Sequence, residues 1–245
     1  MILRRIAEGV RNQDWFTVVI EVLIVVVGIF LGLQVDDWNE ARKERALEHE
    51  YLARLAGDIR VDIDEFLKLQ GIFETKAKMI ADLQELPVAE ILSRPEDQLA
   101  LELDYTTWKA LPEIQSATMT ELTSAGRLTL LRDSPLRTAL SSYYSEYELL
   151  SGILSESDGN YRAMFFGAIP GDIYFDMRLS NQLDDLDRLG TALTALQSDP
   201  DFEATANIEI AYAASLIFYL RLFRDRADSL LGQIEPLLLK KGADQ

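Results

Sequence analysis

Few residues of this chain belong to the types that perform chemistry in protein sites. The 245 residues include no cysteine and one histidine, His49, which excludes thiolate zinc sites, cysteine nucleophiles and histidine-rich metal sites. His49 lies in a charged stretch, ALEHEYL, where we expect a surface residue. The sequence contains no G-x-S-x-G, no H-E-x-x-H, no phosphate-binding glycine loop and no EF-hand loop. We therefore predict no catalytic residue, no metal ligand, no cofactor and no enzymatic activity.

Carboxylates are the remaining candidate ligands, and they gather in two acidic clusters. The clusters consist of Asp58, Asp62, Asp64 and Glu65, and of Asp184, Asp185 and Asp187. Carboxylate-bridged metal bundles place a histidine three residues after a glutamate, but the residue three before His49 is Ala46. We interpret both clusters as solvated faces, with weak binding of divalent cations at their surface as the alternative.

The most informative carboxylate is Glu21, because it lies inside an apolar run. Residues 16–35 read FTVVIEVLIVVVGIFLGLQV, twenty residues with this one charge. A helix of that length spans about 30 Å, the thickness of the hydrocarbon core of a bilayer. We predict a transmembrane helix over 16–35, with Trp15 and Trp38 as interfacial anchors. A cleaved signal peptide is the competing interpretation, but the run is long for one and no small-residue cleavage site follows it.

Three residues of this predicted span share one helix face. Gly28 and Gly32 form a G-x-x-x-G pair, which lets two helix backbones approach closely. At 100° per residue, both glycines fall within about 20° of the direction of Glu21. We predict that this face packs against another membrane helix, in a homo-oligomer or a larger membrane complex, with Glu21 hydrogen-bonded across the contact. The alternatives are that Glu21 handles protons or ions, or that it reaches the interface by snorkelling.

The orientation of the span depends on basic residues, which flank it on both sides in similar number. Those before it are Arg4, Arg5 and Arg11, and those after it are Arg42, Lys43, Arg45 and Arg54. We favour a cytoplasmic N-terminus with the large domain outside.

The charge balance excludes a general nucleic-acid binder. The chain has 24 Lys and Arg against 41 Asp and Glu, a formal net charge of −17, so it repels a phosphate backbone. The same charge favours neutral or basic partners for the part outside the membrane. The lipid bilayer is the partner that the sequence specifies directly, and no small-molecule ligand is indicated.

Beyond the span the sequence predicts helices. An apolar stripe at spacings of three and four runs from Leu52 to Leu83. It lapses at Asp62 and Lys76. We expect the membrane helix to continue along this stripe until Pro87 stops it. The predicted division is a tail (1–15), a transmembrane helix (16–35), a stalk helix (36–86), a helical bundle packed with the stalk (87–240) and a second tail (241–245).

Prolines, glycines and capping residues mark further helices within the bundle. They are predicted over residues 96–111, 114–125, 134–155, 183–196 and 200–234. Ser157–Pro170 is the least regular segment, and we predict a loop or small lid there. The apolar centre of the last helix, IAYAASLIFYL, is too short for a second span and indicates a core helix. Three tyrosines of the 134–155 helix are predicted to pack in the core, namely Tyr143, Tyr144 and Tyr147.

The stretch IEVLIVVVGIFLGLQVDDWNEARKER resembles the N-terminal signature of an uncharacterised family of single-span bacterial membrane proteins. The residues that carry the resemblance are Glu21, Gly28, Leu33, Gln34, Asp36, Asp37, Trp38, Asn39 and Glu40. A second stretch, residues 120–144, is similar to the middle segment of that family. The resemblance implies the same topology, in a bacterial inner (plasma) membrane with the large domain in the periplasm, and it implies no activity.

We therefore expect an all-α protein in which one N-terminal transmembrane helix continues into a long stalk helix and an extramembrane helical bundle. The expected role is a scaffold or accessory subunit that self-associates, or docks on other membrane proteins, through Glu21, Gly28 and Gly32. One alternative is an ion- or proton-coupled membrane oligomer that uses Glu21. A second is a membrane-tethered enzyme or ligand sensor with its site near Ser157–Pro170.

Overall fold

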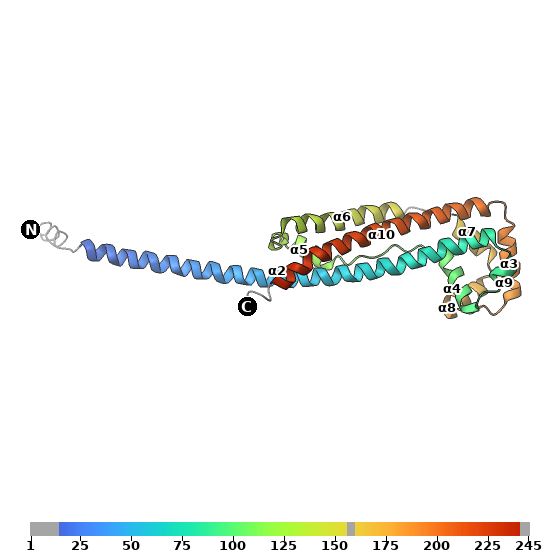
Figure 1. Cartoon of the computed structure of the whole chain (residues 1–245), viewed down its shortest axis with the longest axis horizontal. Helices are drawn as coiled ribbons and strands as arrows, with labels where there is room; N and C mark the ends of the chain where they lie inside the picture. The colour runs from blue at the N-terminus through green and yellow to red at the C-terminus, as the bar shows by residue number, and fades with distance from the viewer. Residues whose placement is uncertain (1–14, 156–159, 241–245) are drawn as a thin grey trace, which may run out of the picture. The chain divides into compact units, whose positions relative to one another are not determined.

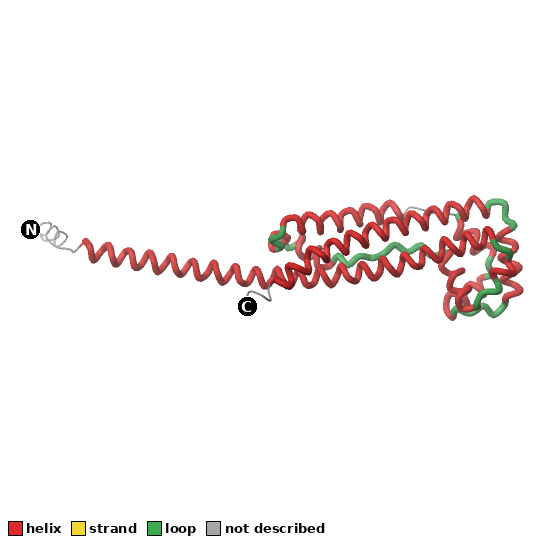
Figure 2. Tube along the Cα trace, in the orientation of Figure 1, coloured by secondary structure: helices red, strands yellow, loops and turns green. Residues whose placement is uncertain are grey.

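The computed structural model describes residues 15–155 and 160–240, and within these ranges the chain is helical without strands (Figure 2). This confirms the predicted all-α class. The elements, labelled in Figure 1, are α2 (Trp15–Glu85), α3 (Val88–Ile91), α4 (Glu96–Thr106), α5 (Ala117–Ser124), the 3₁₀ turn η1 (Leu128–Leu130), α6 (Ser134–Ser155), α7 (Tyr161–Ala168), α8 (Gly171–Ser180), α9 (Leu186–Gln197) and α10 (Phe202–Lys240). Apart from Trp15, both predicted tails lie outside the described residues.

The chain divides into two compact units, residues 1–51 and 52–245. The described part of the first unit is the N-terminal portion of α2, and all side chains from Val19 to Val35 are exposed on it. This portion is long and apolar enough to cross a membrane, and none of its most apolar window is buried. An apolar helix that buries no face within its own unit is suited to a lipid environment, because water would leave its surface unfavourably exposed.

The second unit is a helical bundle built on residues 52–85 of α2 and on α10. Hydrogen bonds join Arg60 to Glu235, Glu74 to Arg221 and Gln84 to Asn207. The residue number rises along α2 as it falls along α10, so the two helices run antiparallel. Helix α6 packs against α10, and the shorter helices α3, α4, α7, α8 and α9 lie around the C-terminal end of α2 (Figure 1).

The apolar stripe predicted on α2 forms the core of this bundle. Its members are at most 4% exposed: Leu52, Leu55, Ile59, Phe66, Leu69, Phe73, Ile80 and Leu83. Their spacing of three and four keeps all of them on one helix face, and burial of that face drives the packing. The boundary between the two units falls inside the predicted stalk, because continuous burial along α2 begins where this stripe begins.

Two predicted helices are shorter in the structure because a loop separates them. Helix α4 ends at Thr106, where the hydroxyls of Thr106 and Thr107 donate to the carbonyls of Leu103 and Asp104. Such local hydrogen bonds end a helix by competing with its own pattern. Residues 107–116 then form a loop, and α5 begins at Ala117. Gly126, which follows this helix, has a φ of +65°, the left-handed conformation typical of a glycine at the C-terminal cap of a helix.

The prediction of a loop or lid at Ser157–Pro170 is wrong for its described part. Tyr161–Ala168 is helix α7, and Tyr161 and Phe165, one turn apart, are both 0% exposed. Burial of these two rings outweighs the low helix propensity of Gly167. Residues 157–159 lie outside the described residues.

Helix α10 is longer than predicted. It continues past residue 234 through Pro236 to Lys240, because a proline near the end of a helix removes only one of its hydrogen bonds. Ala206, Ala213 and Leu216 are buried in the bundle, which is the packing expected of a core helix. By length and composition α10 is also a candidate membrane span, with 33% of its most apolar window buried.

Candidate functional site

The face predicted to pack in the membrane is uncovered in the structure. Glu21, Gly28 and Gly32 are exposed on one continuous helix. A Cβ atom built on either glycine would meet no other atom within 4 Å. Within its own unit, therefore, no side chain lies against either glycine, as close approach of a second helix requires.

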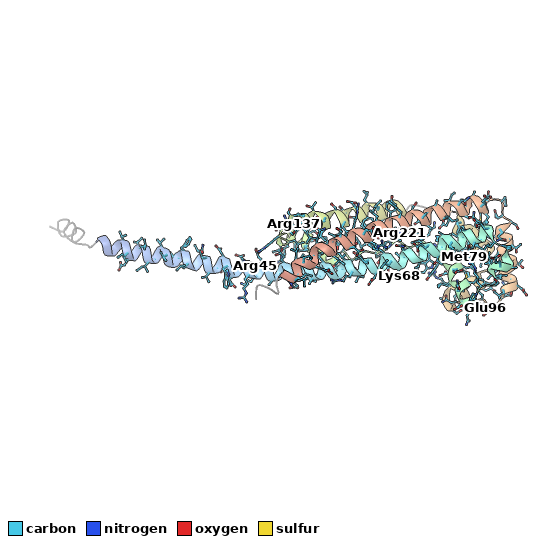
Figure 3. All side chains as sticks on the ribbon, viewed as in Figure 1. Arg45, Lys68, Met79, Glu96, Arg137 and Arg221 are labelled. Carbon is cyan, nitrogen blue, oxygen red and sulfur yellow. The ribbon has the colours of Figure 1, made fainter. Side chains whose placement is uncertain are left out.

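One of the two predicted interfacial anchors, Trp38, is also exposed. Trp38 is 61% exposed, and side chains project freely around this portion of α2 (Figure 3). The side chain of Trp15 lies outside the described side chains. An exposed indole one turn beyond an apolar run matches the position of an aromatic belt residue.

Lys76, one of the two lapses in the α2 stripe, forms a buried ion pair. Lys76 is 0% exposed, and its ammonium donates to the carboxylate of Glu209 on α10 and, at 2.7 Å, to the carbonyl of Trp108. The rings of Phe73 and Tyr212 lie 5.9 and 6.0 Å from the ammonium. Burial lowers the pKa of Lys76, and the neighbouring Glu209 opposes this shift. The pair connects α2, α10 and the loop after α4.

The other lapse, Asp62, is buried. The interpretation of its acidic cluster as a solvated face is therefore wrong for this residue. Asp62 is 1% exposed; one carboxylate oxygen accepts the Gln115 N–H at 2.6 Å and the other accepts the Tyr143 hydroxyl at 2.9 Å. Burial raises the pKa of Asp62 to about 6; the two hydrogen bonds oppose this shift, and the nearby Asp58 adds to it. The two donors replace hydrogen bonds to water, which makes burial of the carboxylate tolerable.

Of the three tyrosines of α6 that were predicted to pack in the core, one is fully buried and two are partly buried. Tyr143 is 2% exposed and contacts the ring of Phe223 on α10. Tyr144 and Tyr147 are partly buried, and their hydroxyls donate to the carbonyls of Gln115 and Pro112. All three hydroxyls are therefore used inside the bundle.

A third buried carboxylate was not predicted. Asp104 of α4 is 6% exposed and accepts two hydrogen bonds, at 2.8 and 2.7 Å, from the guanidinium of Arg178 on α8. The indole N–H of Trp108 donates to the same carboxylate at 3.0 Å. The guanidinium also lies 5.2 Å from the centre of the Trp108 ring. This network fixes α4, α8 and the start of the loop relative to one another.

In the second acidic cluster Asp184 and Asp187 are exposed, as predicted for a solvated face, and Asp185 caps a helix. The carboxylate of Asp185 accepts the backbone N–H of Arg188 at the start of α9. The guanidinium of Arg188 pairs with Asp172 of α8. Among residues 15–155 and 160–240, no group of three or more acidic or histidine side chains is arranged to hold a metal ion. His49 is half-buried.

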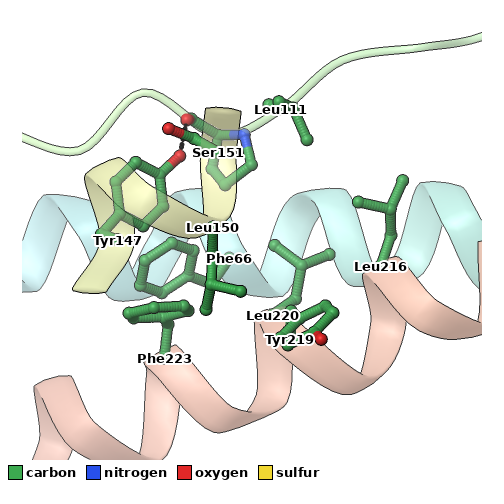
Figure 4. A pocket seen from close by; sticks show the side chains of 10 residues that line it. Phe66, Leu111, Tyr147, Leu150, Ser151, Leu216, Tyr219, Leu220 and Phe223 are labelled. Atoms are coloured by element: carbon green, nitrogen blue, oxygen red, sulfur yellow. Dashed lines mark hydrogen bonds between the residues drawn. The ribbon is translucent and has the colours of Figure 1, made fainter. Parts of the chain in front are cut away.

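The surface of the described bundle has depressions, and two of them lie along α10. The first holds about 320 Å³ of space between α2, α6, α10 and the 107–116 loop, and apolar and aromatic side chains such as Phe66 and Phe223 line it (Figure 4). The second holds about 470 Å³ between α6 and α10, where Glu146 pairs with Arg226. The hydroxyl-bearing side chains of Ser142 and Ser229 also line the second depression, beside the carboxylate that is paired with Arg226.

Comparison with known proteins identifies a family without a known function. A family model described as "Family of unknown function (DUF6090)" matches residues 21–156, more than half of the 245 residues. The matched range begins at Glu21 and extends through α6, so it includes both stretches that carry the sequence resemblance. No curated protein and no solved structure matches the chain.

Proposed function

The chain belongs to the DUF6090 family of unknown function, and from that premise we propose that it is a membrane-anchored helical scaffold or accessory subunit. In this proposal the apolar portion of α2 crosses the bilayer once. The observation that carries the proposal is the complete exposure of Val19–Val35, a segment whose only charge is Glu21. An apolar helix whose side chains are uncovered within its own unit is stable when lipid or another membrane helix surrounds it.

The proposed docking face is the line of Glu21, Gly28 and Gly32. Lipid is as apolar as the helix, so membrane helices associate through close backbone packing and hydrogen bonds rather than through the hydrophobic effect. The two glycines permit that close packing, and no other part of the described chain obstructs it. A carboxylate on the same face finds its hydrogen-bond partner on the second helix, where the alternative is an unsatisfied polar group in lipid.

We place the N-terminus in the cytoplasm and the bundle in the periplasm, at the inner membrane of a bacterium. The net charge of −17 favours neutral or basic partners for the bundle and disfavours nucleic acid. The proposal assigns the chain no catalytic role. Its function is then to hold copies of itself, or other membrane proteins, at a defined place.

The test is the mass and composition of the intact particle extracted from its native membrane in mild detergent. We expect a particle built from several 27.7 kDa chains or one that contains other membrane proteins. Gly28→Leu fills the groove and is expected to release the 27.7 kDa chain alone. Val26→Leu is the control, because it places the same leucine side chain about 160° away on the same helix, outside the proposed docking face. A wild-type particle of one chain, or equal behaviour of both variants, contradicts the proposal.

Glu21→Gln separates this function from an ion- or proton-coupled oligomer. The amide of glutamine still forms hydrogen bonds, so a packing role predicts an assembled and functional particle. In the coupled oligomer the particle assembles, but proton or ion flux in reconstituted vesicles is lost. Exposure of Glu21 on the proposed docking face is the observation that keeps this second function under test.

A further inference from the structure

Helix α10 carries an exposed side that is free of charge. Between Ala204 and Leu220 its one charged residue is Glu209, which is buried in the pair with Lys76. The outward side is uncharged, and we call it the α10 stripe. Its exposed members are Ala204, Ile208, Ala211, Ser215 and Phe218, and the half-buried Leu222 ends it as the sixth. Ile208 and Phe218 are 61% and 63% exposed, so the stripe is uncovered at its largest side chains.

The spacing of the stripe indicates what kind of surface covers it. Its six members follow one another at intervals of four, three, four, three and four residues, which is the 3.5-residue period of a coiled-coil seam. The buried side of the same helix, which packs in the bundle, follows a similar period from Ala206 through Ala213 to Leu220. A seam with this period stays in register with a neighbouring helix. The stripe therefore has the pattern of a helix-packing surface, and no helix in the described part of the chain occupies it.

We propose that the α10 stripe packs against the α10 stripe of a second copy of this chain, as a parallel, in-register pair. This inference rests on the proposed function, because the membrane span brings copies together in one orientation. Copies inserted the same way in one membrane are related by rotation about an axis along its normal, and a twofold rotation brings the same surface of the two copies together. Ser215 lies near the centre of the stripe, and its hydroxyl already donates to the Ala211 carbonyl at 2.9 Å. Covering it therefore leaves no polar group unsatisfied.

The size of the stripe favours a second copy over a free partner. A helix segment of this length is about 28 Å long and about 10 Å wide, so it offers roughly 280 Å² of projected surface. A stable interface between free proteins requires about 800 Å² from each side. The stripe is too small to recruit a free protein, but it suffices for a chain already held nearby. A shared membrane span supplies that proximity as a high effective concentration.

The charge distribution favours the same occupant. Two chains of net charge −17 repel each other over most of their surfaces, so contact is least unfavourable where neither carries a charge. The residues on either side of the stripe are also uncharged in its central part, at Asn207, Tyr212, Ala214 and Tyr219. A basic partner would find no carboxylate to pair with there. The first exposed charge toward the C-terminus is Arg221, labelled in Figure 3.

The absence of cysteine from the chain permits a direct test by a single introduced thiol. Ser215→Cys in the full-length protein, oxidised in its native membrane, is expected to yield a disulfide-linked species of twice 27.7 kDa on a non-reducing gel. Ser145→Cys on α6 is the matched control, because Ser145 is also exposed and donates to the carbonyl four residues before it. We expect no dimer band from this control. Adding Phe218→Glu to Ser215→Cys is expected to abolish the band, since it places like charges in the seam.

The outcomes separate this inference from the function on which it rests. If the extracted wild-type particle contains several copies and Ser215→Cys gives no dimer, the pairing of α10 is overturned and the membrane scaffold stands. Equal cross-linking of the two cysteine variants indicates random collision and also overturns the pairing. A wild-type particle with a single copy contradicts the pairing and self-association together.

Discussion

Lys76 of α2 and Glu209 of α10 form an ion pair in which neither side chain is more than 3% exposed. Burial removes the hydration of both charges, so such a pair contributes little net stability by itself. Removing only one of the two charged side chains is destabilising, because the remaining charge is then buried without a partner. The same ammonium also donates to the carbonyl of Trp108, so the loop after α4 depends on the pair as well.

Glu209→Leu is expected to lower the free energy of unfolding by about 3–5 kcal/mol, because it leaves the Lys76 ammonium uncompensated. The double variant Lys76→Met with Glu209→Leu is expected to regain much of that loss. It should remain below the wild type by about 1–3 kcal/mol, since the Trp108 carbonyl loses its donor. Urea unfolding of the full-length protein in detergent, followed by circular dichroism, measures both. A double variant as unstable as the single one would show that the cost comes from packing and not from the charge.

Asp62 is expected to make the bundle more stable in acid than at neutral pH. Its pKa is about 6 in the folded protein and 3.8 as the ordinary value, so the folded state holds the proton more tightly. The stabilisation is fully present below about pH 4 and is lost as the pH rises through about 6. Two pKa units at about 1.4 kcal/mol each make this change roughly 3 kcal/mol.

Asp62→Asn is expected to remove this pH dependence. The amide oxygen still accepts the Gln115 N–H, and the side chain keeps its shape without a charge. We expect the free energy of unfolding between pH 4 and pH 7 to fall in the wild type by roughly 3 kcal/mol more than in the variant. Asp64→Asn, at an exposed position of the same helix, is the control and should follow the wild type. Identical profiles for the wild type and Asp62→Asn would exclude Asp62 as the source.

Local spacing predicted the buried side of α2, but it did not predict how the lapses in that side are used. The apolar positions from Leu52 to Leu83 are sufficient to define a buried face. A charged residue within such a face is either a solvated break or a buried site, and its partners decide between the two. The partners of Asp62 and Lys76 are Tyr143 and Glu209, 81 and 133 residues further along the chain. No local pattern contains that information.

The position of the candidate membrane face on its helix follows from local spacing alone, because it depends on one helix only, and its packing role stays a prediction. At 100° per residue, Glu21, Gly28 and Gly32 fall on one face of the helix. The Asp104–Arg178 network could not be predicted in this way, since 74 residues separate its two members. At Tyr161–Ala168 the glycines around the segment predicted a loop, but burial of the aromatic residues stabilises a helix. Tertiary packing overrides propensity there.

Arg178→Lys is expected to weaken the network around Asp104 although it retains the charge. Both hydrogen bonds to Asp104 come from one guanidinium nitrogen, Nη1, so an ammonium can replace them, but lysine cannot stack on the Trp108 ring as a planar guanidinium does. Arg178 is partly exposed, so we expect a loss of about 1 kcal/mol in unfolding free energy. Trp108 also reports the change directly, because its fluorescence emission should shift to longer wavelength as water reaches the ring. Trp15→Phe and Trp38→Phe in the background leave Trp108 as the only tryptophan. Unchanged emission would show that the network does not shield the ring.

Two glycine substitutions are expected to change stability in opposite directions. Gly126 has φ +65°, so Gly126→Ala should cost about 1–2 kcal/mol of unfolding free energy. Gly57 is exposed within α2, so Gly57→Ala should add about 1 kcal/mol. A Cβ atom on either residue meets nothing within 4 Å, which excludes steric contact as the cause. Opposite shifts of the urea midpoint would therefore isolate backbone conformation as the source, whereas a stabilising Gly126→Ala would mean that this residue does not adopt the left-handed conformation.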